Sequence, residues 1–305
     1  MVQLIFTIFV PIMGRRGMTG NPDVILGVAT AFFTVLILIF VFPVLVSIRR
    51  PKWLQYLLTL LFTVTMSLIS LSNYGFPYTG DMAWPAPKRI SVNHVSRTLE
   101  DGVTDGGLLV CRQDHYSLSH LEDNVPDYSN AHEVTQEWCD ERMACGLPSY
   151  SMKKDARGCL WIPVSPPTFH QPTGVTVTKT EKMEDNLTNI TMAVAGPNRV
   201  LLLMSSLGSA NIVQWSLGNV SSNDKLPYYT AQMIRGYGNE ETPHTIWVVV
   251  KGWSSHRGDR VLVSVSGHYT SGLEMTSSTL RRFRDSHPSW TSLQGWTVDY
   301  KYLVI

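Results

Sequence analysis

The chain contains 305 residues, of which 16% are charged, and its formal net charge is +1. This charge is unevenly divided, because residues 1–80 hold five basic residues and one acid, whereas residues 81–305 hold 20 basic and 23 acidic residues. The mildly acidic larger part lacks the basic surface that binding to nucleic acid requires, so we expect no nucleic-acid partner. The length allows a membrane region together with one domain of ordinary size.

The first 14 residues, MVQLIFTIFVPIMG, are apolar. They are too few to cross a bilayer, which takes about 20 residues. They also lack the basic start and the small-residue cleavage site of a signal peptide, since Arg15 and Arg16 follow instead. We interpret residues 1–14 as the end of a longer helix, and we expect the chain to be a fragment of a longer protein.

Two long uncharged runs follow, at residues 24–48 and 53–80. Each is long enough for a membrane helix, so we expect spans at 24–48 and 53–74 that form a hairpin within a transmembrane region, residues 1–80. The alternative is a pair of buried helices in a soluble core, but such helices usually carry a polar stripe, and neither run has one. The absence of ionisable groups from both spans argues against a transporter or a proton relay.

The short link between the spans carries three positive charges, Arg49, Arg50 and Lys52. Basic residues favour the cytosolic side of a membrane, but Arg15, Arg16 and two further basic residues lie on the opposite side. The charges therefore only weakly favour a cytosolic link.

Three N-glycosylation sequons lie in the part after the spans and begin at Asn186, Asn189 and Asn219. Together with four clustered cysteines, they favour a lumenal position for residues 81–305. Because Asn186 and Asn189 are so close in sequence, we expect at most one of them to be occupied in most molecules.

All four cysteines lie within 49 residues, at Cys111, Cys139, Cys145 and Cys159. An even number in such a short stretch fits two disulfides, for which three connectivities are possible. The five-residue loop between Cys139 and Cys145 makes that pair the first choice, which leaves Cys111 with Cys159. Four reduced thiols are the alternative, and a zinc site is disfavoured because the spacing lacks Cys-x-x-Cys.

After the spans, the sequence pattern changes at residue 174 from irregular to β-rich. Residues 81–173 form a linker and an irregular cysteine-containing region, with short strands expected at Arg89–Leu99 and Gly107–Arg112. Residues 174–305 contain eight short β-rich segments separated by turn signals, and one helix at Ser277–Ser286 with a serine N-cap and Pro288 beyond its end. The expected strands are Val175–Lys179, Ile190–Ala195, Arg199–Ser205, Ile212–Leu217, Tyr228–Ile234, Thr245–Trp253, Arg260–Tyr269 and Trp296–Ile305. This pattern predicts a mainly-β domain, an antiparallel β-sandwich with one short helix.

A search for catalytic and metal-binding motifs gives little. Asp114, His115 and His120 could approach one another on a loop, but their spacing matches no known ligand set, so a hydrolase built on them is a minor hypothesis. There is no G-x-S-x-G nucleophile motif and no phosphate-binding glycine loop. The segment 267–272, GHYTSG, could hold a site, although turn geometry alone explains its glycines. We therefore assign no catalytic residue, no metal ligand and no cofactor to this chain.

The sandwich also contains five tryptophans, at positions 215, 247, 253, 290 and 296. Exposed tryptophans on sandwich domains can bind sugars, which makes a glycan- or protein-binding module the alternative function. Filling of the core between two sheets is the plainer interpretation.

Several segments resemble a known family: IFTIFVPIMGRRG with NPDVILG, PKRISVNHVSRTL, QWSLGN, HYTSG and HPSW. In this order and spacing they are similar to the C-terminal third of the endoplasmic reticulum metallopeptidase 1 family, from about Gln3 to Ile305. The resemblance implies a lumenal zinc aminopeptidase-like domain, absent from this chain, followed by membrane helices and a final lumenal domain. No position here matches the family's zinc ligands or its catalytic glutamate.

From the residues and the resemblance together, we expect a non-catalytic part of a zinc metallopeptidase in the endoplasmic reticulum membrane, with residues 81–305 in the lumen. Its expected partners are the lipid bilayer and either the family's peptidase domain or other lumenal proteins.

Overall fold

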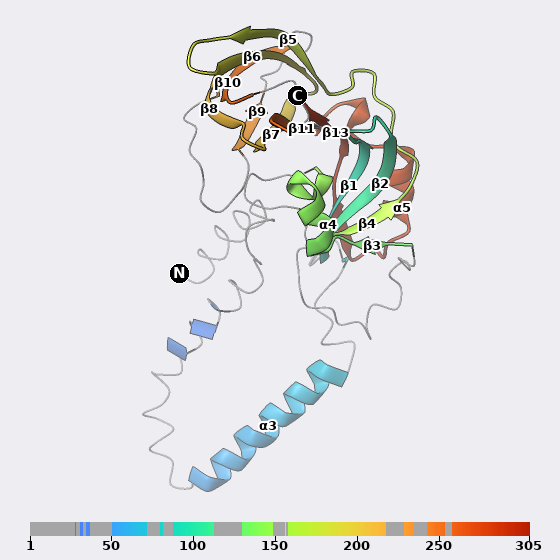
Figure 1. Cartoon of the computed structure of the whole chain (residues 1–305). Helices are drawn as coiled ribbons and strands as arrows, with labels where there is room; N and C mark the ends of the chain where they lie inside the picture. Colours follow the sequence, from blue (N-terminus) through green and yellow to red (C-terminus); the bar gives the residue numbers. More distant parts are fainter. Residues whose placement is uncertain are drawn as a thin grey trace. The chain divides into compact units, whose positions relative to one another are not determined.

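The computed structural model of the chain describes residues 51–71, 80–81, 88–112, 130–148, 156, 158–217, 229–234, 243–253 and 258–305, together with positions 28, 31, 32, 35 and 36 (Figure 1). Its contacts divide the chain into two units. One holds residues 1–89, 113–125 and 288–292, and the other holds residues 90–112, 126–287 and 293–305. The expected partial helix at 1–14 and nearly all of the span at 24–48 lie outside the described residues, as do Arg49 and Arg50.

The first unit contains one long described helix, α3, at Pro51–Leu71. Proline suits the first turn of a helix, where its missing N–H has no intrahelical partner in any case. Lys52 is exposed near this end. Within the described part of the chain, no helix combines the length and the hydropathy needed to cross a membrane.

The described strands and short helices of the rest of the chain have the following bounds. The strands are β1 (Lys88–Thr98), β2 (Thr104–Arg112), β3 (His132–Glu133), β4 (Leu160–Pro163), β5 (Gly174–Lys182), β6 (Leu187–Ala195), β7 (Arg199–Leu207), β8 (Asn211–Trp215), β9 (Tyr229–Ile234), β10 (His244–Lys251), β11 (Arg260–Tyr269), β12 (Thr291–Gln294) and β13 (Thr297–Val304). The helices are α4 (Gln136–Glu141), α5 (Ser278–Asp285) and the 3₁₀ turns η3 (Met143–Gly146) and η4 (Leu273–Met275). The chain is therefore mainly β, as its sequence predicted.

The strands form two sheets. A four-stranded sheet has the order β5-β6-β10-β8, and a larger sheet has the order β3-β4-β2-β1-β13-β11-β7-β9, with β12 paired to β1. The large sheet combines strands from both sides of residue 174. The prediction of an antiparallel arrangement misses one pair, because β1 runs parallel to β13, with His94 opposite Thr297. A parallel pair needs a long crossover, and nearly the whole domain lies between these two strands.

The two sheets pack face to face over one end of the large sheet. Strand β6 alternates half-buried and buried residues along its length, as a strand with one face on a core must. Its buried residues Ile190, Met192 and Val194 belong to one hydrophobic cluster with Leu202 of β7 and Val263 of β11. This cluster is the core of the expected sandwich.

The other end of the large sheet is covered by different elements on its two faces. On the face shared with the small sheet, helix α5 packs through Leu280 against Val92 and Val110. On the opposite face, the segment that carries the disulfides packs through Leu147 against Val95 and other residues of the sheet. Helix α5 and the small sheet thus cover different parts of the same face of the large sheet, and a cleft lies between them.

Candidate functional site

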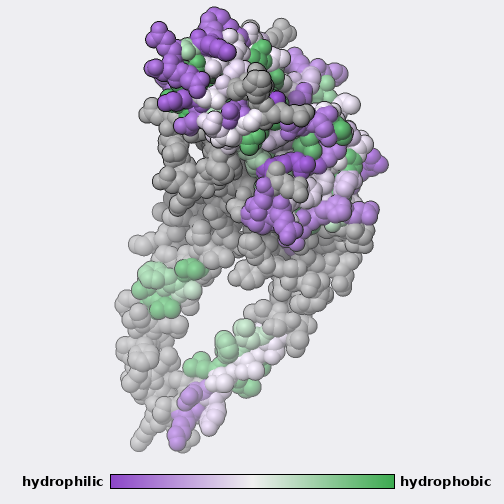
Figure 2. All heavy atoms as spheres, in the orientation of Figure 1, coloured by the Kyte–Doolittle hydropathy of each residue, from purple (hydrophilic) through white to green (hydrophobic). Residues whose placement is uncertain are grey.

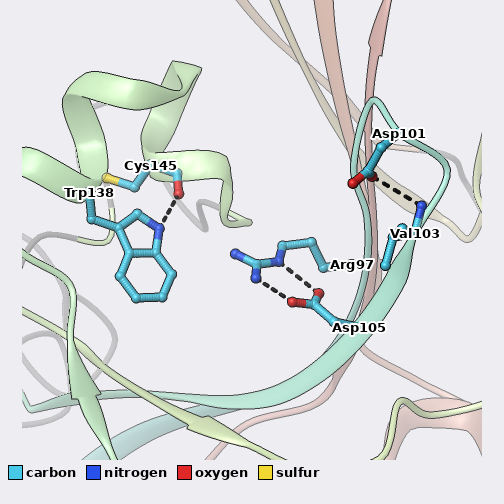
Figure 3. Close-up of polar contacts among 6 residues, drawn as sticks. All are labelled: Arg97, Asp101, Val103, Asp105, Trp138 and Cys145. Carbon is cyan, nitrogen blue, oxygen red and sulfur yellow. Dashed lines mark hydrogen bonds and ion pairs between the residues drawn. The ribbon is translucent and has the colours of Figure 1, made fainter.

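Two disulfides, Cys111–Cys159 and Cys139–Cys145, hold the cover on the opposite face. These are the pairs that the spacing favoured. The short loop closed by Cys139 and Cys145 contains left-handed backbone at Ala144 and Cys145, with φ of 53° and 63°. The indole N–H of Trp138 donates to the carbonyl oxygen of Cys145 at 3.0 Å, which closes this loop on the helix α4 before it (Figure 3).

Arg97 of β1 is the charged group beneath this cover. Its guanidinium forms a two-pronged ion pair with Asp105 of β2, with Nε to Oδ1 at 2.8 Å (Figure 3). The guanidinium also lies 4.8 Å from the ring centre of Trp161. The Arg97 side chain is only 8% exposed, against 41% for Asp105. These contacts all lie within the domain, so the cluster stabilises the cover.

The cleft on the other face has a floor formed by strands β1, β11 and β13 and a rim formed by two loops. The first loop, residues 165–173, crosses the sheet at Gly267, where any Cβ would collide with Thr173 and Pro197. The second loop contains η4 and leads into α5. Two cavities of about 350 Å³ and about 340 Å³ lie along the cleft, and both are lined by His170, Leu273 and Glu274.

Hydrogen bonds with the side chains of Glu274 and Tyr269 fix the first loop in place. The Glu274 carboxylate accepts a hydrogen bond from the backbone N–H of His170 at 2.5 Å. Nearby, the Tyr269 hydroxyl donates to the carbonyl oxygen of Gln171 at 2.6 Å. Burial raises the pKa of the Tyr269 hydroxyl well above its usual range, so it stays a neutral donor. The first cavity includes the GHYTSG turn that the sequence identified as a place able to hold a site.

The second cavity contains a histidine–serine pair that sequence reasoning missed. Nδ1 of His94, in β1, lies 2.7 Å from Oγ of Ser277, and Nε2 of His94 lies 2.9 Å from the carbonyl oxygen of Ser165. Because that carbonyl can only accept, Nε2 carries the proton and Nδ1 of the neutral ring accepts from the serine hydroxyl. Burial lowers the pKa of His94, and the hydrogen bond to Ser165 opposes this in part, so the ring is neutral at pH 7. His94 and Ser277 are 183 residues apart in sequence, which left no local signal of their contact.

The expected glycosylation sites differ in their surroundings. Asn186 is exposed in the turn between β5 and β6, where Asp185 and Asn186 both have positive φ, as a two-residue hairpin turn of type I′ requires. Asn189 is half-buried within β6, and its side-chain oxygen is shielded from solvent. Asn219 lies outside the described residues.

The other candidate residues from the sequence either have a structural role or lie outside the described residues. Asp114, His115 and His120 lie outside the described residues, and the described part of the chain shows no cluster of side chains that could hold a metal ion. Trp215 is buried, and the four other tryptophans of residues 174–305 are half-buried. Sugar binding through fully exposed tryptophans therefore has no support among these five rings.

Sequence comparison places these features in a family. Residues 85–302 match the family described as endoplasmic reticulum metallopeptidase 1, C-terminal domain. The chain belongs to this family. It is 25% identical over 322 residues to endoplasmic reticulum metallopeptidase 1 of Homo sapiens and 26% identical over 316 residues to the same protein of Mus musculus. Both alignments cover 100% of this chain and 34% of the relative, so the chain spans about a third of the length of these relatives.

Solved structures show only weak likeness. The yeast delta-COP-I mu-homology domain covers 72% of this chain and 97% of its own, with 9% identity and a TM-score of 0.28. The chitin-binding domain of a chitinase from Pyrococcus furiosus covers 34% of this chain and 94% of its own, with 12% identity and a TM-score of 0.21. Neither likeness bears on the fold or the function of this chain.

Proposed function

We propose that this chain is the membrane-anchored, lumenal C-terminal part of an endoplasmic reticulum zinc metallopeptidase. In this role residues 81–305 tether and support the peptidase domain, or bind its lumenal partners, through contact area rather than cleavage of peptide bonds. The family match over residues 85–302 carries the proposal. The zinc and its ligands would belong to the peptidase domain of the whole protein.

The disulfides support a lumenal position for this domain. Structural disulfides form and persist in oxidising compartments such as the lumen of the endoplasmic reticulum and are rare in the cytosol. The bridge Cys111–Cys159 joins β2 of the large sheet to the residue before β4, the bridge Cys139–Cys145 lies within the cover, and Cys145 and Cys159 belong to the hydrophobic core of this region. The domain would lose the anchoring of this cover if it resided in a reducing compartment.

The two uncharged runs support the membrane anchor. We propose spans at 24–48 and 53–74, each of which includes residues outside the described part of the chain, since α3 covers only residues 53–71 of the second. Hydrophobic residues of α3 are exposed (Figure 2), and they include Leu60, Leu61 and Phe62. Such a surface marks contact with a membrane or a protein. The hydroxyls of Thr59 and Thr63 donate to carbonyl oxygens one turn earlier, so they need no water.

The test is a glycosidase mobility shift on the chain expressed with microsomes. Loss of mass after glycosidase treatment, with Arg49–Lys52 accessible to protease from outside, would support the proposed orientation. An unshifted band with freely alkylated Cys139 and Cys145 would contradict it. Zinc-dependent release of amino acids from aminoacyl substrates by the purified chain would contradict the proposal that this chain has no peptidase activity of its own.

A binding module is the second candidate, and the cleft between the two covers is the observation that favours it. Its two cavities lie side by side and share His170, Leu273 and Glu274, while Leu273 is 97% exposed at their common rim. Substitution of Leu273 by Asp should then abolish co-purification of lumenal partners without changing the fold. Unchanged co-purification would count against this candidate.

A further inference from the structure

The contact between Ser277 and His94 has the arrangement of a nucleophile and its general base. A neutral imidazole accepts the serine hydroxyl at Nδ1, 2.7 Å away, while its other nitrogen donates to a fixed acceptor, the carbonyl oxygen of Ser165. Nucleophilic serines are activated in this way, by a base that a third group orients. The carbonyl takes the orienting position that a carboxylate fills in a Ser-His-Asp triad.

The surroundings give a small substrate access to the serine and to the edge of the histidine. Ser277 is half-buried and lines the cavity of about 340 Å³, which His94 also lines although only 2% of its surface is exposed. Because so little of the ring is exposed, its Nδ1 lone pair stays directed at the serine hydroxyl until a substrate enters. A cavity of this size accommodates a small acyl group together with its leaving group.

Backbone donors for a developing negative charge lie beside the serine. Ser278 and Thr279 form the first turn of α5, where backbone N–H groups have no acceptor within the helix. Both residues line the same cavity as Ser277. The N–H of the residue after a nucleophile, reinforced by the positive end of a helix dipole, is a common donor to the oxyanion of acyl transfer.

Helix capping explains only part of this geometry. Oγ of Ser277 accepts from the N–H of Leu280 at 3.0 Å, which is the usual N-cap hydrogen bond. An N-cap needs only an acceptor, and Asp or Asn would serve equally well. Capping does not account for a serine proton directed at a buried histidine whose tautomer is fixed by a second contact.

We propose that Ser277 and His94 form an acyl-transfer site for small uncharged esters, independent of the proposed tethering role. Ser277 Oγ bonds to the acyl carbon and passes its proton to His94 Nδ1. The bond to the leaving alcohol breaks, and the alcohol oxygen takes that proton. Water then attacks the acyl-serine, gives a proton to Nδ1, and the released Oγ regains it as the carboxylic acid leaves.

The lining of the cavity defines the substrate class. Pro166, Pro167 and Leu273 provide apolar walls, and the hydroxyls of Thr168 and Thr276 are uncharged. The carboxylate of Glu274 is the acidic group at this cavity, so it disfavours anionic substrates. Short, neutral acyl esters fit these walls best.

The test uses the full chain in detergent-solubilised microsomes and a fluorophosphonate probe, which reacts with activated serines. Wild-type chain should be labelled, with the adduct on the peptide that contains Ser277. Ser277→Asp keeps an acceptor for the N–H of Leu280 but removes the nucleophile, so its labelling should vanish. Ser286→Ala, at the other end of α5, is the matched control and should label like wild type. His94→Gln should slow labelling by about 100-fold or more.

Each result is decisive because folding is followed separately by resistance to limited proteolysis. An unlabelled wild-type chain overturns the proposal. So does equal labelling of a protease-resistant Ser277→Asp variant, since another serine would then be reacting. If His94→Gln proves protease-sensitive, hydrolysis of p-nitrophenyl acetate by wild type and Ser277→Asp decides instead, and equal rates overturn the proposal.

Discussion

The carboxylate of Asp299 in β13 accepts a hydrogen bond from the backbone N–H of Thr173, at 2.7 Å between Oδ2 and nitrogen, across 126 residues of sequence. Both residues are buried. Thr173 immediately precedes β5, so this contact anchors the start of the small sheet on the centre of the large one. It also fixes the end of the loop that forms one rim of the cleft.

Asp299 should make the stability of the domain depend on pH. Burial raises the pKa of this carboxyl, while the hydrogen bond from Thr173 and the charge of Lys301 oppose the rise. The folded state therefore binds the proton more tightly than the unfolded chain, whose Asp titrates at about 3.9. The free energy of unfolding should fall as pH rises from there through the raised pKa, and should then level off.

Asp299→Asn should remove this fall in the free energy of unfolding with rising pH. Its side-chain amide oxygen can still accept the hydrogen bond from the N–H of Thr173. Thermal unfolding between pH 4 and pH 8 measures the effect, with the exposed Asp285→Asn as control. The same pH profile in wild type and Asp299→Asn would show that another group is responsible.

Arg97→Met should destabilise the domain by about 2 kcal/mol, because it keeps most of the packing volume but removes the ion pair with Asp105 and the contact with Trp161. Arg284→Met is the control. The guanidinium of Arg284 lies 3.9 Å from the Asp285 carboxylate and both side chains are exposed, so its loss should cost less than about 1 kcal/mol. Urea unfolding of the two variants compares them, and equal losses would contradict a structural role for the Arg97 cluster.

The two disulfides should contribute unequally. Cys111 and Cys159 are separated by 48 residues, and Cys139 and Cys145 by six. Loop-closure entropy in the unfolded chain then predicts that replacing Cys111 and Cys159 by alanines lowers the free energy of unfolding by about 4 kcal/mol, and that replacing Cys139 and Cys145 lowers it by about 2 kcal/mol. Denaturant midpoints of the two double variants measure this order, and the reverse order would mean that native packing rather than chain entropy dominates.

A folded chain should carry a glycan at Asn186 and not at Asn189. Asn186 is exposed at a hairpin turn, whereas a glycan on Asn189 would have to emerge from the half-buried middle of β6. Asn186→Asp retains a residue that tolerates positive φ and should remove one glycosidase-sensitive mass step. Thr191→Ala, which destroys only the second sequon, should leave that step in place. A step lost in Thr191→Ala but kept in Asn186→Asp would reverse the assignment.

Local patterns predicted the elements of the sandwich well. The alternation in β6, the unbroken β-rich run of β11 and the serine cap before α5 depend on nearby residues, and these elements were predicted within about three residues of their observed bounds. The helix α4 was missed because it has only six residues and spans less than two turns, too few for a helical period to show. The sequence placed it inside an irregular region.

The pairing of the large sheet and the cleft could not be predicted in the same way. The contact of β1 with β13 and that of His94 with Ser277 join residues roughly 200 positions apart, and each depends on the finished tertiary structure. The cysteine pairing was accessible because loop length restricts which thiols meet. The GHYTSG turn was noticed from its composition, but its place in the cleft comes from the crossing of residues 165–173 over Gly267.

The parallel pairing of β1 with β13 sets the order in which this domain can mature. The centre of the large sheet has a vacant strand position until residues 297–304 have left the ribosome. Until then β1 and β11 present unpaired edges, which favour aggregation and chaperone binding. Folding of the sheet must therefore wait for the synthesis of β13, and a chain that stops before Thr297 loses the strand that joins the two halves of the sheet.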